Sequence, residues 1–143
     1  MTVEPHRFLV PTAGPGLYEF THGVTGWLQE ADVRQGILCL FVHHTSCSLL
    51  IQENADADVQ SDLRAFFDRL VPPSDHPGMS YLRHTNEGPD DMPAHIKASV
   101  LPVSLTIPVV SGALALGHWQ GIYLFEHRTA PHQRSVQAQF LSG

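Results

Sequence analysis

An uninterrupted apolar run, I-L-C-L-F-V at residues 37–42, constrains the fold of this chain more than any other feature. A short apolar run that follows a glycine, here Gly36, is typical of a β-strand. Successive side chains of a strand point to opposite faces of its sheet, so this strand is apolar on both faces. Such a strand needs cover on both sides, from a second sheet, from helices or from a neighbouring subunit. We therefore expect a layered fold.

The N-terminal part of the chain predicts two strands and a helix. The strands cover residues 7–10 and 16–20 and flank the turn sequence P-T-A-G-P-G, so we expect them to form a hairpin. Thr21 is expected to cap the helix that follows, since threonine is a preferred N-cap residue. The apolar residues of that helix recur at helical spacing and are Val24, Trp27, Leu28 and Ala31.

The remaining segments predict two helices and four strands. A strand over residues 47–52 precedes a helix that ends near Leu70, with Asn54 as its expected cap. The apolar stripe of this helix consists of Val59, Leu63, Phe66, Phe67 and Leu70. A short helix begins at Pro93, because proline is tolerated at the first helical position, and it ends near Val100. Three strands follow over residues 104–109, 113–126 and 134–141, the middle one bent at Gly117 and Gly121. Together the elements predict one α+β domain over residues 1–143, with mixed, sandwich-like sheets and about three helices.

Charge and composition narrow the class of protein. The formal net charge is -6 and Lys97 is the single lysine, so there is no basic stripe for a nucleic-acid backbone. The N-terminus has no basic segment before an apolar one, and no run is long enough to span a membrane, so we expect a soluble, cytoplasmic protein. The spacing of Cys39 and Cys47 matches neither a redox motif nor a zinc ribbon, which favours reduced core thiols.

Histidine is unusually frequent, with 10 in 143 residues, and three histidines can converge. His44 follows the apolar strand, His84 lies in the polar loop of residues 71–92, and His95 lies in the first turn of the short helix. Three imidazoles can hold a divalent cation, most typically zinc, and leave a position open for water or substrate. The alternative is three hydrogen-bonded structural histidines. His43 competes with His44, because adjacent strand residues point to opposite faces and periodicity does not choose between them.

Two acidic residues of the same loop are candidates for the chemistry. Glu87 follows His84 by three residues and precedes a Gly-Pro turn, so it can act as a general base or orient a metal-bound water. An exposed loop carboxylate is the alternative. Asp91 is expected first of all to contribute to the cap of the helix that begins at Pro93.

Polar and aromatic residues near the last strands suggest ligand binding. Arg128 and Arg134 lie on either side of one turn, and paired guanidinium groups suit phosphate or carboxylate recognition. Arginines on a solvated hairpin are an equally good interpretation. Trp119 and Gln120 lie between glycines in G-H-W-Q-G, where the indole can cover a flat ligand or simply pack in the core.

Four strings of residues connect the chain to a known family. They are H-T-S-C-S-L-L-I-Q-E-N-A-D, E-G-P-D-D-M-P-A-H-I-K-A-S, L-G-H-W-Q-G-I-Y-L-F-E-H-R and the closing R-S-V-Q. In this order they resemble the YjbQ family of small proteins, also described as secondary thiamine-phosphate synthases. The resemblance extends from about Phe8 to the end of the chain. His118 departs from the pattern, which more often has threonine there.

The resemblance implies a compact domain of sandwich-like sheets, assembled as a homotrimer with sites near the subunit boundaries. It selects His44 over His43 as the ligand beside His84 and His95. Other positions that match the family motifs are Glu53, Asp62, Glu87, Lys97, Trp119, Gln120, Glu126, Arg128 and Arg134.

The activity implied by the family is thiamine-phosphate synthesis, in which a pyrimidine pyrophosphate joins a thiazole phosphate and pyrophosphate leaves. We accordingly expect a metal-dependent enzyme that acts on a small phosphorylated metabolite. A metal ion, Lys97, Arg128 and Arg134 would face the departing pyrophosphate, and Trp119 with Gln120 would hold the pyrimidine. The alternatives are a non-enzymatic module that binds a small molecule or metal, and a metal-dependent phosphate-ester hydrolase.

Overall fold

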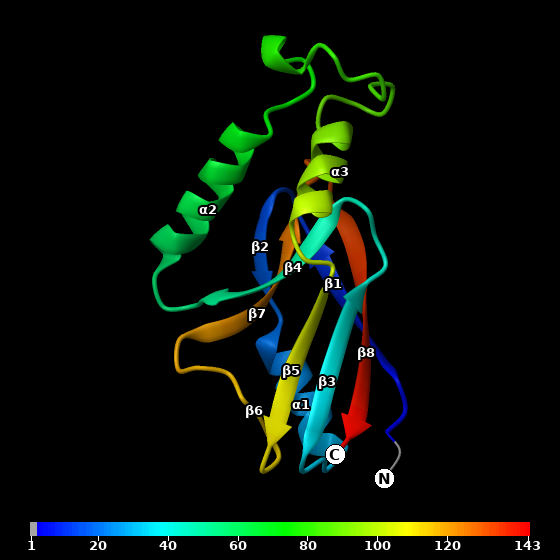
Figure 1. Ribbon diagram of the computed structural model, residues 1–143, viewed down its shortest axis with the longest axis vertical. Helices are drawn as coiled ribbons and strands as arrows, with labels where there is room; N and C mark the ends of the chain where they lie inside the picture. The colour runs from blue at the N-terminus through cyan, green and yellow to red at the C-terminus, as the bar shows by residue number, and fades with distance from the viewer. Residues whose placement is uncertain (1–2) are drawn as a thin grey trace.

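The computed structural model describes residues 3–143 as two antiparallel sheets with three α-helices (Figure 1). One sheet has the strand order β1-β8-β3-β5-β6 and the other β2-β7-β4. The expectation of a single α+β domain with sandwich-like sheets is confirmed, although the strand pairs are antiparallel rather than mixed. Within residues 3–143, no helix combines the length and the apolar character needed to cross a membrane.

The elements follow one another in this order: β1 (His6–Thr12), β2 (Gly16–Glu19), α1 (Thr21–Glu30), β3 (Gly36–Val42), β4 (Cys47–Glu53), α2 (Ala57–Leu70), a 3₁₀ turn (Pro77–Met79), α3 (Asp91–Val100), β5 (Ser104–Val110), β6 (Ala113–Leu114), β7 (Gln120–Glu126) and β8 (His132–Ser142). Both chain ends lie at the bottom of the view in Figure 1, and α2 and α3 lie toward the opposite end.

The hydrophobic core is enclosed by α1 and the inner faces of the two sheets. β3 contributes Leu38, Leu40 and Val42, each at most 2 % exposed. Further core residues are Val24 and Leu28 of α1, Leu49 of β4, and Ile122 and Leu124 of β7. These side chains alternate along their strands with residues of the opposite face, as pleated strands require.

The expected N-terminal hairpin is wrong. β1 pairs with β8 in the larger sheet, whereas β2 pairs with β7 in the smaller one. The segment between them passes from one sheet to the other, with Gly14 and Gly16 at positive φ. The single strand expected over residues 113–126 is likewise two strands, since β6 belongs to the larger sheet and β7 to the smaller.

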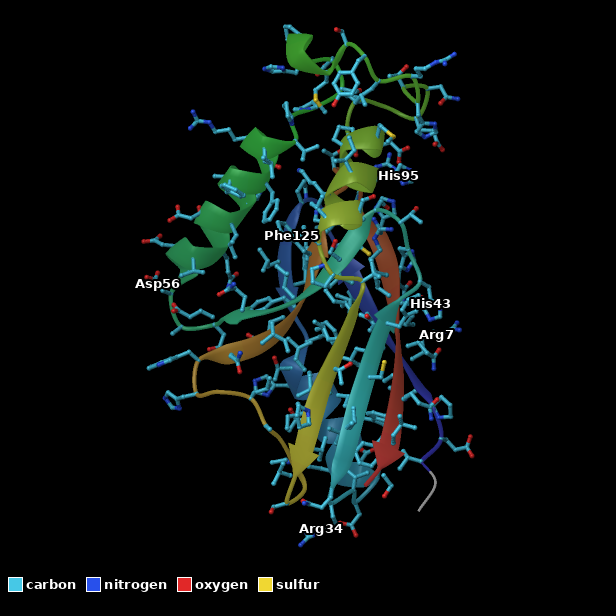
Figure 2. The ribbon with its side chains drawn as sticks, in the orientation of Figure 1. Arg7, Arg34, His43, Asp56, His95 and Phe125 are labelled. Atoms are coloured by element: carbon cyan, nitrogen blue, oxygen red, sulfur yellow. The ribbon has the colours of Figure 1, made fainter. Side chains whose placement is uncertain are left out.

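Cover on both faces is found at β7 rather than at β3. The outer face of β7 lies under α2, where the rings of Phe67 and Phe125 are 5.9 Å apart and Gln60 donates to the hydroxyl of Tyr123 (Figure 2). On the outer face of β3, Ile37 and Phe41 remain 45 % and 48 % exposed. If this face of β3 is covered, the cover therefore comes from another molecule.

The three helix starts differ from those expected. Asp56, not Asn54, caps α2, because its carboxylate accepts from the backbone N–H of Asp58 at 2.9 Å. Thr21 is the first residue of α1 and does not cap it; its hydroxyl instead accepts the N–H of Ile122. α3 begins at Asp91, two residues before Pro93, and no side chain caps it among the described residues. The expected capping role of Asp91 is therefore wrong.

Candidate functional site

Two residues of α3 and one from the preceding loop form a compact group of metal-ligand type. Asp91 and His95 are four residues apart and so share a helix face. The Nε2 atoms of His84 and His95 lie 2.8 Å and 3.4 Å from the same oxygen of Asp91, Oδ2. One ligand atom from each of the three residues lies within 4.8 Å of the others. Two imidazoles and a carboxylate suit zinc, and also ferrous iron.

Glu87 adds a second carboxylate to this group. Its Oε2 lies 2.9 Å from the Nε2 of His84, which also contacts Asp91. One imidazole N–H cannot donate well to two oxygens at once, so this crowded arrangement favours a cation among the three groups. Glu87 is 59 % exposed at its side chain, whereas that of Asp91 is 5 % exposed. The group is thus open to solvent on the side of Glu87 and closed at Asp91.

Arg128 fixes the two neighbouring aspartates. Its Nε donates to Asp90 at 2.8 Å and its Nη1 to Asp91 at 2.7 Å, while Nη2 donates to the backbone oxygen of Glu87. The guanidinium thus pairs with two carboxylates, those of Asp90 and Asp91, while the carboxylate of Glu87 lies against His84, so three negative charges face one guanidinium and two imidazoles. Such an excess attracts a divalent cation.

The pKa values of both aspartates favour the charged, ligand-competent form. Burial alone would raise the pKa of Asp90, but the hydrogen bonds from Arg128 and Thr129 outweigh it and hold the pKa at about 2. Burial likewise opposes ionisation of Asp91, and the hydrogen bond from His84 together with the charge of Arg128 outweighs it, so that its pKa is lowered. Both groups are therefore carboxylates at neutral pH.

His44 lies apart from this group. Its Nε2 accepts the backbone N–H of Ser135 at 2.9 Å, which leaves Nδ1 as the ring nitrogen able to bind anything else. His44 and His95 line one hollow of about 340 Å³, whereas His43 is exposed and packs against Phe41 (Figure 2). Burial, followed by the charge of Arg134, lowers the pKa of His44, so its imidazole is neutral. The structure thus groups Asp91, rather than His44, with His84 and His95.

The two expected phosphate-binding arginines are both engaged with carboxylates. Arg134 is 4 % exposed, and its guanidinium donates to both oxygens of Glu126 and to the hydroxyl of Ser46. It ties β8 to β7 inside the protein and does not reach the histidine group's surface. Lys97 lies on another face of α3, where its ammonium donates to Asp68 of α2 at 2.8 Å.

Trp119 and Gln120 lie far from the histidine group along β7. They stand at the start of this strand, and Arg128 follows its end. A strand of seven residues separates these positions by about 20 Å. Trp119 is 58 % exposed, and the side chain of Gln120 accepts the N–H of Gly117 within a local turn. The structure does not bring these residues together with the histidines.

The spacing of Asp91 from His95 is a sequence signal for a shared ligand face. A helix start at Asp91 would have put both residues on one face, but the start expected at Pro93 excluded Asp91 from the helix. Asp90 and Thr129 carried no such signal, because residues 38 or more positions apart meet only through the fold.

The fold and this group define the chain as a small two-sheet α+β protein with a candidate metal centre at the start of α3. A family model described as "UPF0047 protein YjbQ-like" matches residues 6–143, and the chain belongs to that family. It is 48 % identical over 128 residues to a UPF0047 protein of Synechocystis sp., covering 90 % of this chain and 84 % of that one. Identity to UPF0047 protein YjbQ of Salmonella typhimurium is 46 % over 124 residues, with 86 % of each chain covered.

Solved structures share this fold. A hypothetical protein from Aeropyrum pernix matches with a TM-score of 0.86 at 27 % identity, over 99 % of this chain and 100 % of its own. An uncharacterised YjbQ/UPF0047 protein from Clostridium acetobutylicum matches with a TM-score of 0.81 at 30 % identity, over 95 % of this chain and 99 % of its own. The resemblance inferred from the sequence motifs is confirmed at the level of family and fold.

Proposed function

We propose that this protein is a metal-dependent enzyme that acts on a small phosphorylated metabolite, with the ion held by His84, Asp91 and His95. One observation carries the proposal: Glu87 and Asp91 both contact the same imidazole nitrogen, within an excess of negative charge. Zinc is the first candidate, since two imidazoles and one carboxylate match known catalytic zinc sites. When bound, the ion would act as a Lewis acid toward a phosphoryl oxygen.

The side chains around the ion have separate proposed roles. Asp91 is a proposed ligand through Oδ2, and Arg128 holds it in place through Oδ1. Glu87 is the proposed general base, because its carboxylate is exposed and lies 2.9 Å from the Nε2 of His84. Thiamine-phosphate synthesis, the activity that the motif resemblance implies, is the first reaction to assay, and hydrolysis of phosphate esters is the second.

Assembly and location complete the proposal. We place the protein in the cytoplasm, in keeping with its two free thiols, Cys39 and Cys47. A homotrimer would cover the exposed outer face of β3, and the hollow lined by His44 and His95 also includes Phe41 of that face. A neighbouring subunit seated there would lie beside the metal group.

The metal proposal is tested by elemental analysis and by zinc titration of the metal-free protein. We expect about one equivalent of zinc per chain, and an affinity at least about tenfold lower in Asp91→Asn and His95→Ala. Asp62→Asn is the matched control, because Asp62 is an exposed carboxylate of α2. Zinc below about a tenth of an equivalent per chain, or equal zinc affinity in all variants, would contradict the proposed metal centre.

Turnover separates the enzyme from a non-enzymatic binding module. Glu87→Gln should retain zinc and lose at least about a hundredfold in kcat, because it removes the proposed base. Binding of phosphorylated substrates without product in the zinc-loaded protein would favour the module instead.

A further inference from the structure

A cavity of about 250 Å³ lies between α2, α3 and the end of β7. Its walls include Asp68 of α2, Pro93 and Lys97 of α3, and His127 and Thr129 after β7. Pro93 and Lys97 follow Asp91 and His95 by two residues each, or about 200° around a helix, so they lie on nearly the opposite side of α3 from the metal group. The cavity therefore opens on a different face of α3, and Asp90, which Arg128 holds beside Asp91, lies at its border with the metal group.

Side chains that line this cavity carry hydrogen-bond donors without partners. Lys97 is 7 % exposed and has three N–H donors, of which the contacts among residues 3–143 account for one, the bond to Asp68. Arg64, on the rim, meets Asp68 only at 3.8 Å. Asp90 also lines the cavity, and its charge is paired with Arg128, whose Nε donates to Oδ2 together with the N–H and hydroxyl of Thr129. Two N–H groups of the Lys97 ammonium and the guanidinium of Arg64 thus have no hydrogen-bond partner among residues 3–143.

His127 adds a buried polar atom of the same kind. It is 4 % exposed, and its Nδ1 has no hydrogen-bond partner in the described part of the chain. Burial, followed by the charge of Lys97, lowers the pKa of His127 to about 3, so the ring is neutral. Its Nε2 lies 2.9 Å from the hydroxyl of Ser48. Ser48 is fully buried and its hydroxyl has no other partner among residues 3–143, so we assign its proton to the bond with Nε2. The ring proton then lies on Nδ1, which is a donor as well.

We propose that this cavity binds the oxyanion group, phosphate or carboxylate, of a small organic molecule, with Lys97, His127 and Arg64 as its donors. A nearly buried ammonium with unused donors binds such oxygens strongly. Val71, Pro15, Pro73 and Pro93 form apolar walls for the rest of the molecule. The volume lies just below the range of about 300 Å³ upward that is usual for drug-sized ligands, which restricts the occupant to a small metabolite. The whole chain carries a net charge of -6 and so does not attract anions in general. Binding of an anion would therefore depend on the donors of this cavity.

The test uses metal-free protein, so that it does not depend on the metal centre. Phenyl phosphate and benzoate serve as phosphate and carboxylate probes, with binding followed by calorimetry and by nitrogen-15 spectra of the Lys97 ammonium and the His127 ring. We expect saturable binding of at least one probe, with shifts at both residues. Lys97→Met should weaken it at least about tenfold, because it keeps the length of the side chain and removes its charge.

Matched variants localise the binding. Arg64→Gln should weaken it about two- to fivefold, since this guanidinium lies on the exposed rim. Arg69→Gln, an exposed arginine of the same helix, should leave it unchanged. The proposal is overturned if neither probe saturates, if the His127 resonances stay unchanged at saturation, or if Asp91→Asn alone abolishes binding. The last result would move the anion to the metal group, and the His127 spectrum decides the matter even if Lys97→Met fails to fold.

Discussion

The two carboxylate oxygens of Asp91 contact different groups, one a guanidinium and the other a pair of imidazoles. Oδ1 accepts from Arg128 and Oδ2 faces the Nε2 atoms of His84 and His95. A bound ion would take the place of these imidazole contacts without disturbing the bond to Arg128. The bond to Arg128 therefore already orients Asp91 as a metal ligand. In known metal sites, residues outside the ligand set orient the ligands in the same way.

His127 makes the stability of the protein depend on pH. Its pKa of about 3 in the folded state lies below the ordinary 6.5, so the unfolded chain takes up the proton first as the pH falls. The free energy of unfolding should drop by about 2 kcal/mol between pH 8 and pH 5 on account of this residue, and the loss continues toward the folded pKa. In His127→Gln this part of the pH dependence should vanish, as measured by urea unfolding at each pH. Parallel pH profiles for the two proteins would contradict the prediction.

At the scale of elements, strand β3 is held between β8 and β5 by close backbone approach at its first residue. Gly36 pairs with both Val109 and Ser142. A Cβ atom at this position would overlap the carbonyl oxygen of Leu141 and the ring of Phe140. The glycine that marks the strand start in the sequence is thus also required for sheet packing.

Gly36→Ala should lower the free energy of unfolding by about 3 kcal/mol, because the added methyl meets backbone rather than a flexible side chain. Gly26→Ala is the control within α1, where a Cβ would have nothing within 4 Å. This control should be neutral or stabilising by up to about 1 kcal/mol, since alanine is the better helix former. Equal unfolding midpoints in urea for the two variants would show that the overlap at Gly36 relaxes freely.

At the scale of the whole molecule, the larger sheet exposes apolar side chains on its outer face. Ile37 and Phe41 of β3, Leu9 of β1 and Leu141 of β8 are between 45 % and 58 % exposed. The register places Ile37 directly opposite Leu141. An apolar patch on adjacent strands of one sheet is typical of a protein interface, and a homotrimer is the assembly that we propose.

Phe41→Glu should convert the proposed trimer to monomers, because a carboxylate at a buried subunit contact would lose its hydration without a partner. Light scattering coupled to size-exclusion chromatography measures the mass directly. Phe66→Glu is the comparison, since Phe66 is 58 % exposed on α2. A monomeric wild type would refute the trimer, and dissociation by Phe66→Glu alone would move the interface to α2.

The sequence by itself determined the family, the elements and part of the site. Apolar periodicity found α1, α2 and most strands, because a helix or strand must bury one face regardless of its partners. The sequence pattern singled out His84, His95 and Glu87, and these three residues do lie together. The apolar stripe expected for α2 is correct only in part: Val59, Leu63 and Phe67 are partly buried, whereas Phe66 and Leu70 are 58 % exposed.

Only the tertiary structure decided which strands pair and which residues complete the site. β1 and β2 are neighbours in sequence but lie in different sheets, since the turn between them redirects the chain instead of closing a hairpin. Asp91 and Arg128 meet across 37 residues, and Lys97 turns to α2 instead of to the histidines. Local patterns specify the elements, whereas contacts between distant residues depend on how those elements pack, which no short window of sequence contains.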